Sequence, residues 1–176
     1  MTSRPDHVVG PAAALPPEPA WHARGDVRRR TVHALPAGTV VLTARGERRV
    51  EDVELGERVV TRDIGLTPVR MIVQAPPCDL PTVTIPAHAL GRGRPARDVV
   101  LPAAQPIVIR DARARILFDL PEVRLAAGRI ADGRVVRALP APPVAWYTLA
   151  LDRPGTIYAD GLEVVAGHDD PVDDGF

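Results

Sequence analysis

Most of this sequence consists of short runs rich in β-branched residues, each closed by Gly, Pro or Asp, and this pattern limits the fold more than any other feature. From residue 34 onward, no stretch keeps the 3.6-residue periodicity of an amphipathic helix without an interrupting Pro or Gly. The pattern predicts strands at residues 39–43, 58–62, 69–74, 82–85, 98–101, 107–110, 134–139, 146–151 and 156–159. It also predicts a tight turn at 44–47 and a single helical turn around 121–129. Many short strands at close spacing indicate an all-β sandwich, barrel or related closed fold.

A faint internal echo accompanies these strands. Residues 53–60 read VELGERVV and residues 130–137 read IADGRVVR. In both segments a Gly precedes a β-branched pair, which suits a turn with positive φ followed by a strand. The echo is consistent with two similar halves packed around one core.

The composition argues against several classes of protein. All 22 basic residues are Arg, and they are balanced by 22 acidic residues, so the basic excess of a nucleic-acid binder is absent. Aromatic residues make up only 3% of the chain, which leaves few platforms for stacking a base or a flat cofactor. Cys78 is the single cysteine, which excludes an intrachain disulfide and a cysteine-based zinc site. We therefore predict no cofactor and no metal.

The two ends of the sequence differ in texture from the middle. Residues 1–33 are rich in Pro, Ala and Arg and are predicted to be a disordered tail; residues 34–167 form the predicted domain; residues 168–176 are predicted to be an acidic disordered tail. No stretch approaches the roughly 20 apolar residues that span a bilayer. The first twenty residues lack the pattern of a secretory signal peptide, so we expect a cytoplasmic location by default.

Four segments, in order, resemble the bacterial Hint (hedgehog/intein) domain family. They are AGTVVLTARGERRVEDVELGERVVT at 37–61, DIGLTPVRMI at 63–72, HALGRGRPARDVV at 88–100 and YTLALDRPGTIYADGL at 147–162. The resemblance extends over about residues 34–165. It implies an all-β, horseshoe-like domain with two pseudo-symmetric halves. It also implies self-processing chemistry, in which the first residue of the domain, Cys or Ser, attacks the carbonyl group that precedes it.

The resemblance fails at the residues that would perform this chemistry. The family nucleophile aligns with Ala34, and the family Thr/Ser and His of the next block align with Pro102 and Gln105. Two further family histidines align with Thr148 and Pro154, and only Asp152 between them matches. Alanine has no nucleophile, and Gln cannot shuttle a proton near neutral pH. Asn is absent from the chain, so no Asn cyclisation is available.

A few other residues admit a functional or a plain interpretation. His33 is interpreted as a solvated linker residue rather than a relocated base, and Cys78 as an inert thiol. Asp152 and Arg153 are interpreted as a local surface pair. The loop that contains Arg92, Arg94 and Arg97 either cradles an anion or is simply a shaped turn, and the second interpretation is favoured. Trp146 and Tyr147 are expected to fill the core.

Three hypotheses for function follow from this pattern. The first is a Hint-like module that has lost autoproteolysis and splicing and binds a peptide segment or protein partner. The second is residual self-processing through Thr31, Thr39 or a water molecule. The third is a domain that only folds. We lean towards a protein that is not an enzyme, a pseudoenzyme of its family, because the general acid–base residue is missing.

Overall fold

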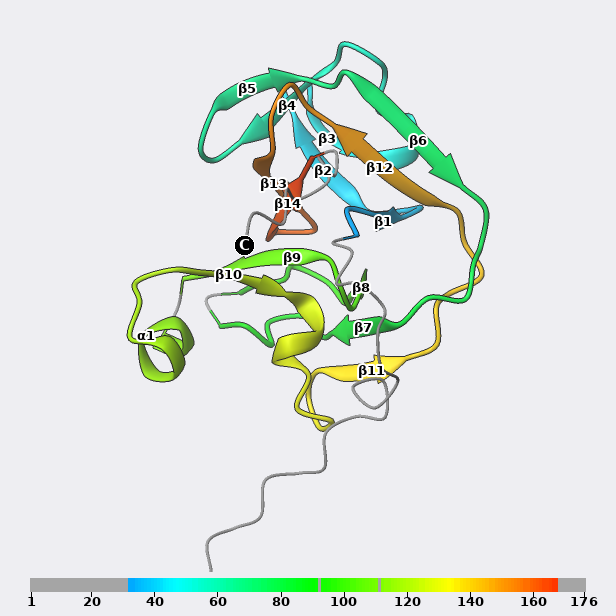
Figure 1. Ribbon diagram of the computed structural model, residues 1–176. Helices are drawn as coiled ribbons and strands as arrows, with labels where there is room; N and C mark the ends of the chain where they lie inside the picture. Colours follow the sequence, from blue (N-terminus) through cyan, green and yellow to red (C-terminus); the bar gives the residue numbers. More distant parts are fainter. Residues whose placement is uncertain (1–31, 92, 111, 168–176) are drawn as a thin grey trace, which may run out of the picture.

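The computed structural model describes residues 32–91, 93–110 and 112–167, and this part of the chain is almost entirely β-structure (Figure 1). The first strands are β1 (Leu35–Pro36), β2 (Val40–Thr43), β3 (Gly46–Arg49), β4 (Arg58–Thr61), β5 (Gly65–Pro68), β6 (Met71–Ala75) and β7 (Thr82–Ile85). The later strands are β8 (Val99–Pro102), β9 (Pro106–Ile109), β10 (Val123–Ala126), β11 (Arg137–Leu139), β12 (Trp146–Ala150), β13 (Gly155–Ala159) and β14 (Leu162–Ala166). The all-β prediction is confirmed.

The strands form three antiparallel sheets. The largest has the order β10-β9-β14-β13-β2-β4-β5, with β3 paired to β2, and the two smaller sheets are β1-β12-β6 and β11-β7-β8. Figure 1 shows β2 to β6 and β12 to β14 in one group and β7 to β11 in another. Two long connections, β6 to β7 and β11 to β12, run between the groups. The hairpin β13–β14 lies at the middle of the largest sheet and joins β2 and β4 to β9.

Two hairpins near the start of the domain are built in the same way. In the β2–β3 hairpin Thr43 lies opposite Gly46, and the Thr43 hydroxyl donates a hydrogen bond to the Gly46 carbonyl oxygen at 3.0 Å. In the β4–β5 hairpin Thr61 lies opposite Gly65, and its hydroxyl donates to the Gly65 carbonyl oxygen at 2.6 Å. Each Thr therefore closes its own turn, and the partner Gly adopts a positive φ that other residues rarely take.

The sequence echo corresponds to a repeated local structure. A 3-10 turn at Val50–Asp52 is followed by Gly56 with φ of 84° and then β4. A second 3-10 turn at Ala127–Ile130 is followed by Gly133 with φ of 71° and then β11. The same order of elements in both places fits the two-halved architecture predicted from the sequence.

Among the described residues, the α-helix lies outside the segment where a helical turn was predicted. The helix α1 is Ala112–Phe118, whereas residues 121–129 contain β10 and the start of the second 3-10 turn. Residues 112–118 lack Pro and Gly and contain good helix formers. Val123–Ala126 pairs with the whole of β9, so tertiary pairing decides the conformation of that segment.

The core is aliphatic, as the composition predicts. Val41, Val59, Ile85 and Leu101 are fully buried in one cluster. Trp146 is also buried, with 2% of its surface exposed. The prediction that Trp146 is a buried core residue is confirmed, and Tyr147 is partly buried against the aliphatic cluster. No helix among the described residues is long and apolar enough to span a membrane.

Candidate functional site: the peptide junction before β1

The site predicted from the sequence lies where the chain enters β1. This strand pairs with β12, with Leu35 opposite Tyr147 and Pro36 opposite Trp146, and this register brings Thr148 of β12 beside His33. Gln105 occupies the turn between β8 and β9. Its backbone N–H donates to the Pro102 carbonyl oxygen at 2.9 Å and its carbonyl oxygen accepts from the Ala127 N–H at 2.8 Å. Three segments far apart in the sequence therefore meet at one point.

The peptide bond between His33 and Ala34 is held from both sides. The Thr148 hydroxyl donates a hydrogen bond to the His33 carbonyl oxygen at 2.6 Å. The Ala34 N–H donates to Oε1 of Gln105 at 2.9 Å, in buried surroundings. We call this pair of contacts, Thr148 on the oxygen and Gln105 on the nitrogen, the junction clamp.

Gln105 is itself fixed by its remaining hydrogen bonds. Its Nε2 donates to the Val165 carbonyl oxygen at 2.9 Å and to the Pro106 carbonyl oxygen at 3.0 Å. The side chain is only 1% exposed. Both ends of the amide are thus engaged, and the orientation of the amide is set by its partners because carbonyl oxygens only accept hydrogen bonds.

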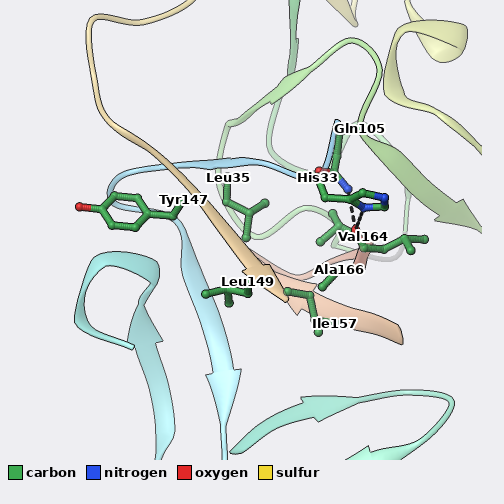
Figure 2. A pocket seen from close by; sticks show the side chains of 9 residues that line it. His33, Leu35, Gln105, Tyr147, Leu149, Ile157, Val164 and Ala166 are labelled. Atoms are coloured by element: carbon green, nitrogen blue, oxygen red, sulfur yellow. Dashed lines mark hydrogen bonds between the residues drawn. The ribbon is translucent and has the colours of Figure 1, made fainter. Parts of the chain in front are cut away.

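His33 contributes to the same network, which corrects the prediction that it is a solvated linker residue. Its Nδ1 lies 2.8 Å from the Val165 carbonyl oxygen, and the ring is partly buried. Because the partner is a carbonyl oxygen, Nδ1 carries the hydrogen in this contact. Figure 2 shows the His33 and Gln105 side chains next to each other. Both are hydrogen-bonded to the Val165 carbonyl oxygen.

A small cavity adjoins the junction. Its volume is about 10 Å³, close to the room that one water molecule needs. In Figure 2 Leu35, Leu149 and Ile157 lie to the left of and below the His33 ring, while the Tyr147 ring points away from them. The residues that line this cavity include no Asp, Glu or Arg. The junction is therefore a tight, largely apolar site.

The other family positions fall into two groups. Ala34, 8% exposed, is part of the junction, and Pro102 ends β8 and accepts the Gln105 N–H that shapes the turn. Asp152 and Pro154 are exposed and form no part of the clamp. The Cβ atom of Pro154 lies 3.1 Å from where a Cβ on Gly167 would stand, so Pro154 packs against the end of β14.

Asp152 is paired with Arg70 and not with its neighbour Arg153, which corrects the predicted local pair. Nε and Nη2 of Arg70 donate to the two carboxylate oxygens of Asp152 at 2.6 and 3.0 Å. The hydrogen bond from Arg70 lowers the pKa of Asp152 below its usual value. Arg70 lies just before β6 and Asp152 just after β12, so the pairing of these two strands brings the residues together although they are far apart in the sequence.

The alternative nucleophiles are placed unequally. The buried Thr39 donates its hydroxyl to the Pro36 carbonyl oxygen at 2.7 Å, within its own turn. Thr31 lies outside the described residues, as do most of the predicted tail 1–33 and the whole of the acidic tail 168–176. Cys78 is exposed. In the part of the chain that the structure describes, no group of three or more His, Cys, Asp or Glu is placed to hold a metal ion.

The loop that contains Arg94 and Arg97 is a shaped turn closed by its own backbone. The His88 N–H donates to the Pro95 carbonyl oxygen at 2.9 Å, and the Leu90 N–H to the Arg94 carbonyl oxygen at 2.9 Å. The side chains of Arg94 and Arg97 pair with Glu163 and Asp160. The backbone thus forms the shaped turn expected from the sequence, and Arg92 lies outside the described residues.

A family model described as the Hint domain matches residues 33–169 of this chain. The chain belongs to the Hint domain family. No curated protein matches it. The match to the family model begins one residue before Ala34, so the junction clamp lies at the start of the matched Hint region.

Solved structures show the same fold at low sequence identity. A bacterial intein-like domain from Clostridium thermocellum aligns with a TM-score of 0.52 at 16% identity, over 78% of this chain and 99% of that one. The Msm DnaB1 intein splicing domain aligns with a TM-score of 0.51 at 16% identity, over 76% of this chain and 99% of that one. These likenesses confirm the Hint fold.

Proposed function

We propose that this Hint domain holds the peptide junction at its start without cleaving it, and that it works as a binding or structural module. One observation carries the proposal: the His33–Ala34 peptide bond is held at its oxygen by Thr148 and at its nitrogen by Gln105. The same pair of contacts would position a bond for self-processing. The residues that supply them here are neutral groups that move no proton.

Cleavage of this bond would need a nucleophile and an acid. Ala34 has no atom that could attack the His33 carbonyl carbon. The leaving nitrogen would have to gain a proton, but Oε1 of Gln105 accepts the hydrogen already on that nitrogen and has none to give. Both missing parts are replaced by groups that stabilise the uncleaved amide.

The half of the site that polarises the carbonyl is still present. The Thr148 hydroxyl lies where a donor to a developing oxyanion would lie. An interaction that is equally strong in the intact peptide and in the transition state does not accelerate a reaction. In this chain the Thr148 contact therefore serves to hold the junction in place.

Residual self-processing is the second candidate, because the Thr148 donor and the adjoining water-sized cavity favour it. A water molecule or the Thr31 hydroxyl would be the nucleophile. The Thr39 hydroxyl is already hydrogen-bonded to the Pro36 carbonyl oxygen, which argues against Thr39 as the nucleophile.

The test is the intact mass of the full-length chain, fresh and after incubation with and without dithiothreitol or hydroxylamine. We expect an unchanged mass under every condition. Loss of a fragment that ends at His33 would overturn the proposal in favour of self-processing.

A pair of variants shows whether the junction keeps its processing geometry. Ala34→Cys with Gln105→His restores a thiol and a proton donor at the clamp, and we expect thiol-induced cleavage after His33. Ala37→Cys with Gln105→His introduces the same two residues with the thiol three residues away, and we expect it to stay intact. Equal behaviour of the two variants would contradict a junction held ready by the clamp.

A further inference from the structure

A second hollow lies on another part of the domain, away from the junction. Its volume is about 270 Å³, against about 10 Å³ for the cavity at the junction. It is formed by the loop between β7 and β8, the end of β9 and the start of β14. We call it the arginine cleft. Its apolar surface is provided by Leu90, Val108, Ile109 and Leu162, each less than a tenth exposed.

The charged groups of the cleft are arranged around one buried carboxylate. The Glu163 side chain is 2% exposed, and its Oε1 accepts hydrogen bonds from Nη1 of Arg94 at 3.2 Å and from Nη2 of Arg110. Its Oε2 faces Nη1 of Arg62 at 3.5 Å, and Arg62 also pairs with Glu122. Three guanidinium groups and two carboxylates leave a net charge of one positive unit.

Arg94 and Arg110 hold more hydrogen-bonding capacity than Glu163 uses. A guanidinium carries five N–H donors, and each of these two groups donates one hydrogen bond to Glu163. Their side chains are 48% and 38% exposed, whereas Glu163 beneath them is buried. The carboxylate therefore fixes both guanidiniums at the rim of the cleft, with donors directed to solvent.

We propose that the arginine cleft binds an acidic peptide segment in which a carboxylate stands next to an aliphatic side chain. The carboxylate of the peptide bridges Arg94 and Arg110, since paired N–H donors match its two oxygens. The aliphatic neighbour covers the apolar surface of Leu90, Val108 and Leu162. The volume of about 270 Å³ suits one or two side chains.

The charge balance favours a carboxylate over a phosphate group. The negative charge of Glu163 lies beneath the guanidiniums. It repels a bound group with two negative charges more strongly than it repels a single carboxylate. A single negative charge neutralises the net positive unit of the cleft. This inference is independent of the proposed function, because no residue of the arginine cleft belongs to the junction clamp.

The probe is a fluorescein-labelled peptide with the sequence HDDPVDDGF, that of residues 168–176, which places Asp next to Val. Its control is the same peptide with every Asp replaced by Asn. Binding is measured by fluorescence anisotropy with the full-length chain at physiological salt. The same titration is made with a full-length variant that carries Asp169→Asn, Asp170→Asn, Asp173→Asn and Asp174→Asn, so that the chain cannot compete with its own acidic residues.

We expect Arg94→Gln and Arg110→Gln each to weaken binding about tenfold, the effect of losing one charged hydrogen-bonded contact. The matched control is Arg45→Gln, whose side chain is 61% exposed on the β2–β3 turn and pairs with Glu54. It removes the same charge elsewhere and should leave the affinity unchanged. Arg110→Lys keeps the charge and the pairing with Glu163 but loses the paired donors, so it should weaken binding as well.

The outcomes separate specific binding from general attraction. Peptide binding that is seen only with the full-length variant carrying the four Asp→Asn changes would also support the proposal. It would mean that the chain's own acidic residues compete with the peptide for the cleft. Equal losses in Arg45→Gln and Arg110→Gln would overturn the proposal, as would equal binding of the Asn peptide. Absence of binding to both proteins would overturn it too.

Discussion

The junction clamp and the arginine cleft both contact β14, the clamp through Val165 and the cleft through Glu163, yet the two sites differ in chemistry. The clamp consists of neutral donors and acceptors, its Gln105 is held by the Val165 carbonyl oxygen, and the adjoining cavity is about 10 Å³. The cleft uses the side chain of Glu163 and guanidinium groups around about 270 Å³. The difference shows that one strand of this Hint domain supports a closed, uncharged site and an open, charged one.

The largest effect is expected from removal of the Gln105 amide. Gln105→Leu keeps the approximate shape but leaves the buried Ala34 N–H without its acceptor. We expect a loss of about 3 kcal/mol in the free energy of unfolding, since an unsatisfied buried donor costs about 1–3 kcal/mol and the amide makes further bonds. Urea denaturation measures the loss.

Thr148→Val is the matched control for the clamp. It removes one partly buried hydrogen bond and preserves the β-branched shape, so the expected loss is about 1 kcal/mol. Because both contacts are neutral, neither loss should change with salt. A deficit in Gln105→Leu that shrinks as NaCl is added would break the contrast between the two sites.

A smaller effect with a strong salt dependence is expected in the cleft. Glu163→Gln removes the carboxylate that three guanidiniums share. We expect a loss of about 2 kcal/mol, below the range for a fully buried pair because the arginines can turn towards solvent. Repulsion among the arginines is screened by salt, so the deficit measured by urea denaturation should fall between low NaCl and about 1 M NaCl. A deficit independent of salt would show that the loss has another cause.

The smallest effect concerns pH. The hydrogen bond from Arg62 holds the pKa of Glu122 below its usual value of 4.5. A group with a lowered folded pKa contributes stability above its unfolded pKa and loses it as the pH falls through the folded pKa. Glu122→Gln should therefore be less stable than wild type at neutral pH, by less than about 1 kcal/mol.

In thermal melts this gap between wild type and Glu122→Gln should close in strongly acidic buffer. The deficit of Thr148→Val should be the same at both pH values, because that contact involves no carboxylate. A Glu122→Gln gap that widens as the pH falls would contradict the assigned direction.

The sequence predicted nine of the strands, and it missed β1, β3, β5, β10 and β14, whose local pattern is short or atypical. β3 reads GERR, and its charged residues hide a strand that is held by pairing with β2. β14 reads LEVVA, and all five residues are buried, so the alternation typical of a half-exposed strand is absent. Its neighbours on both sides, β13 and β9, decide its conformation.

The candidate site was predictable only in part. The resemblance assigned Ala34, Gln105 and Thr148 to one constellation, and the three meet at the junction. The shared partner of His33 and Gln105 is the main-chain carbonyl oxygen of Val165. Every residue has such an oxygen, so the residue type at position 165 does not indicate the contact. The pairing of Asp152 with Arg70 depends on the register of β6 and β12, which local sequence does not encode.

The central place of the β13–β14 hairpin has a consequence for how the domain is made. Strands β2, β4 and β9 are joined through residues 155–166, which leave the ribosome after all the others in these sheets. Contacts between residues so distant in the chain, such as His33 with Val165, form slowly because the intervening loop must close first. During synthesis the edges of the earlier strands therefore stay unpaired until residues 155–166 emerge. In that interval these edges must be protected from pairing with other chains.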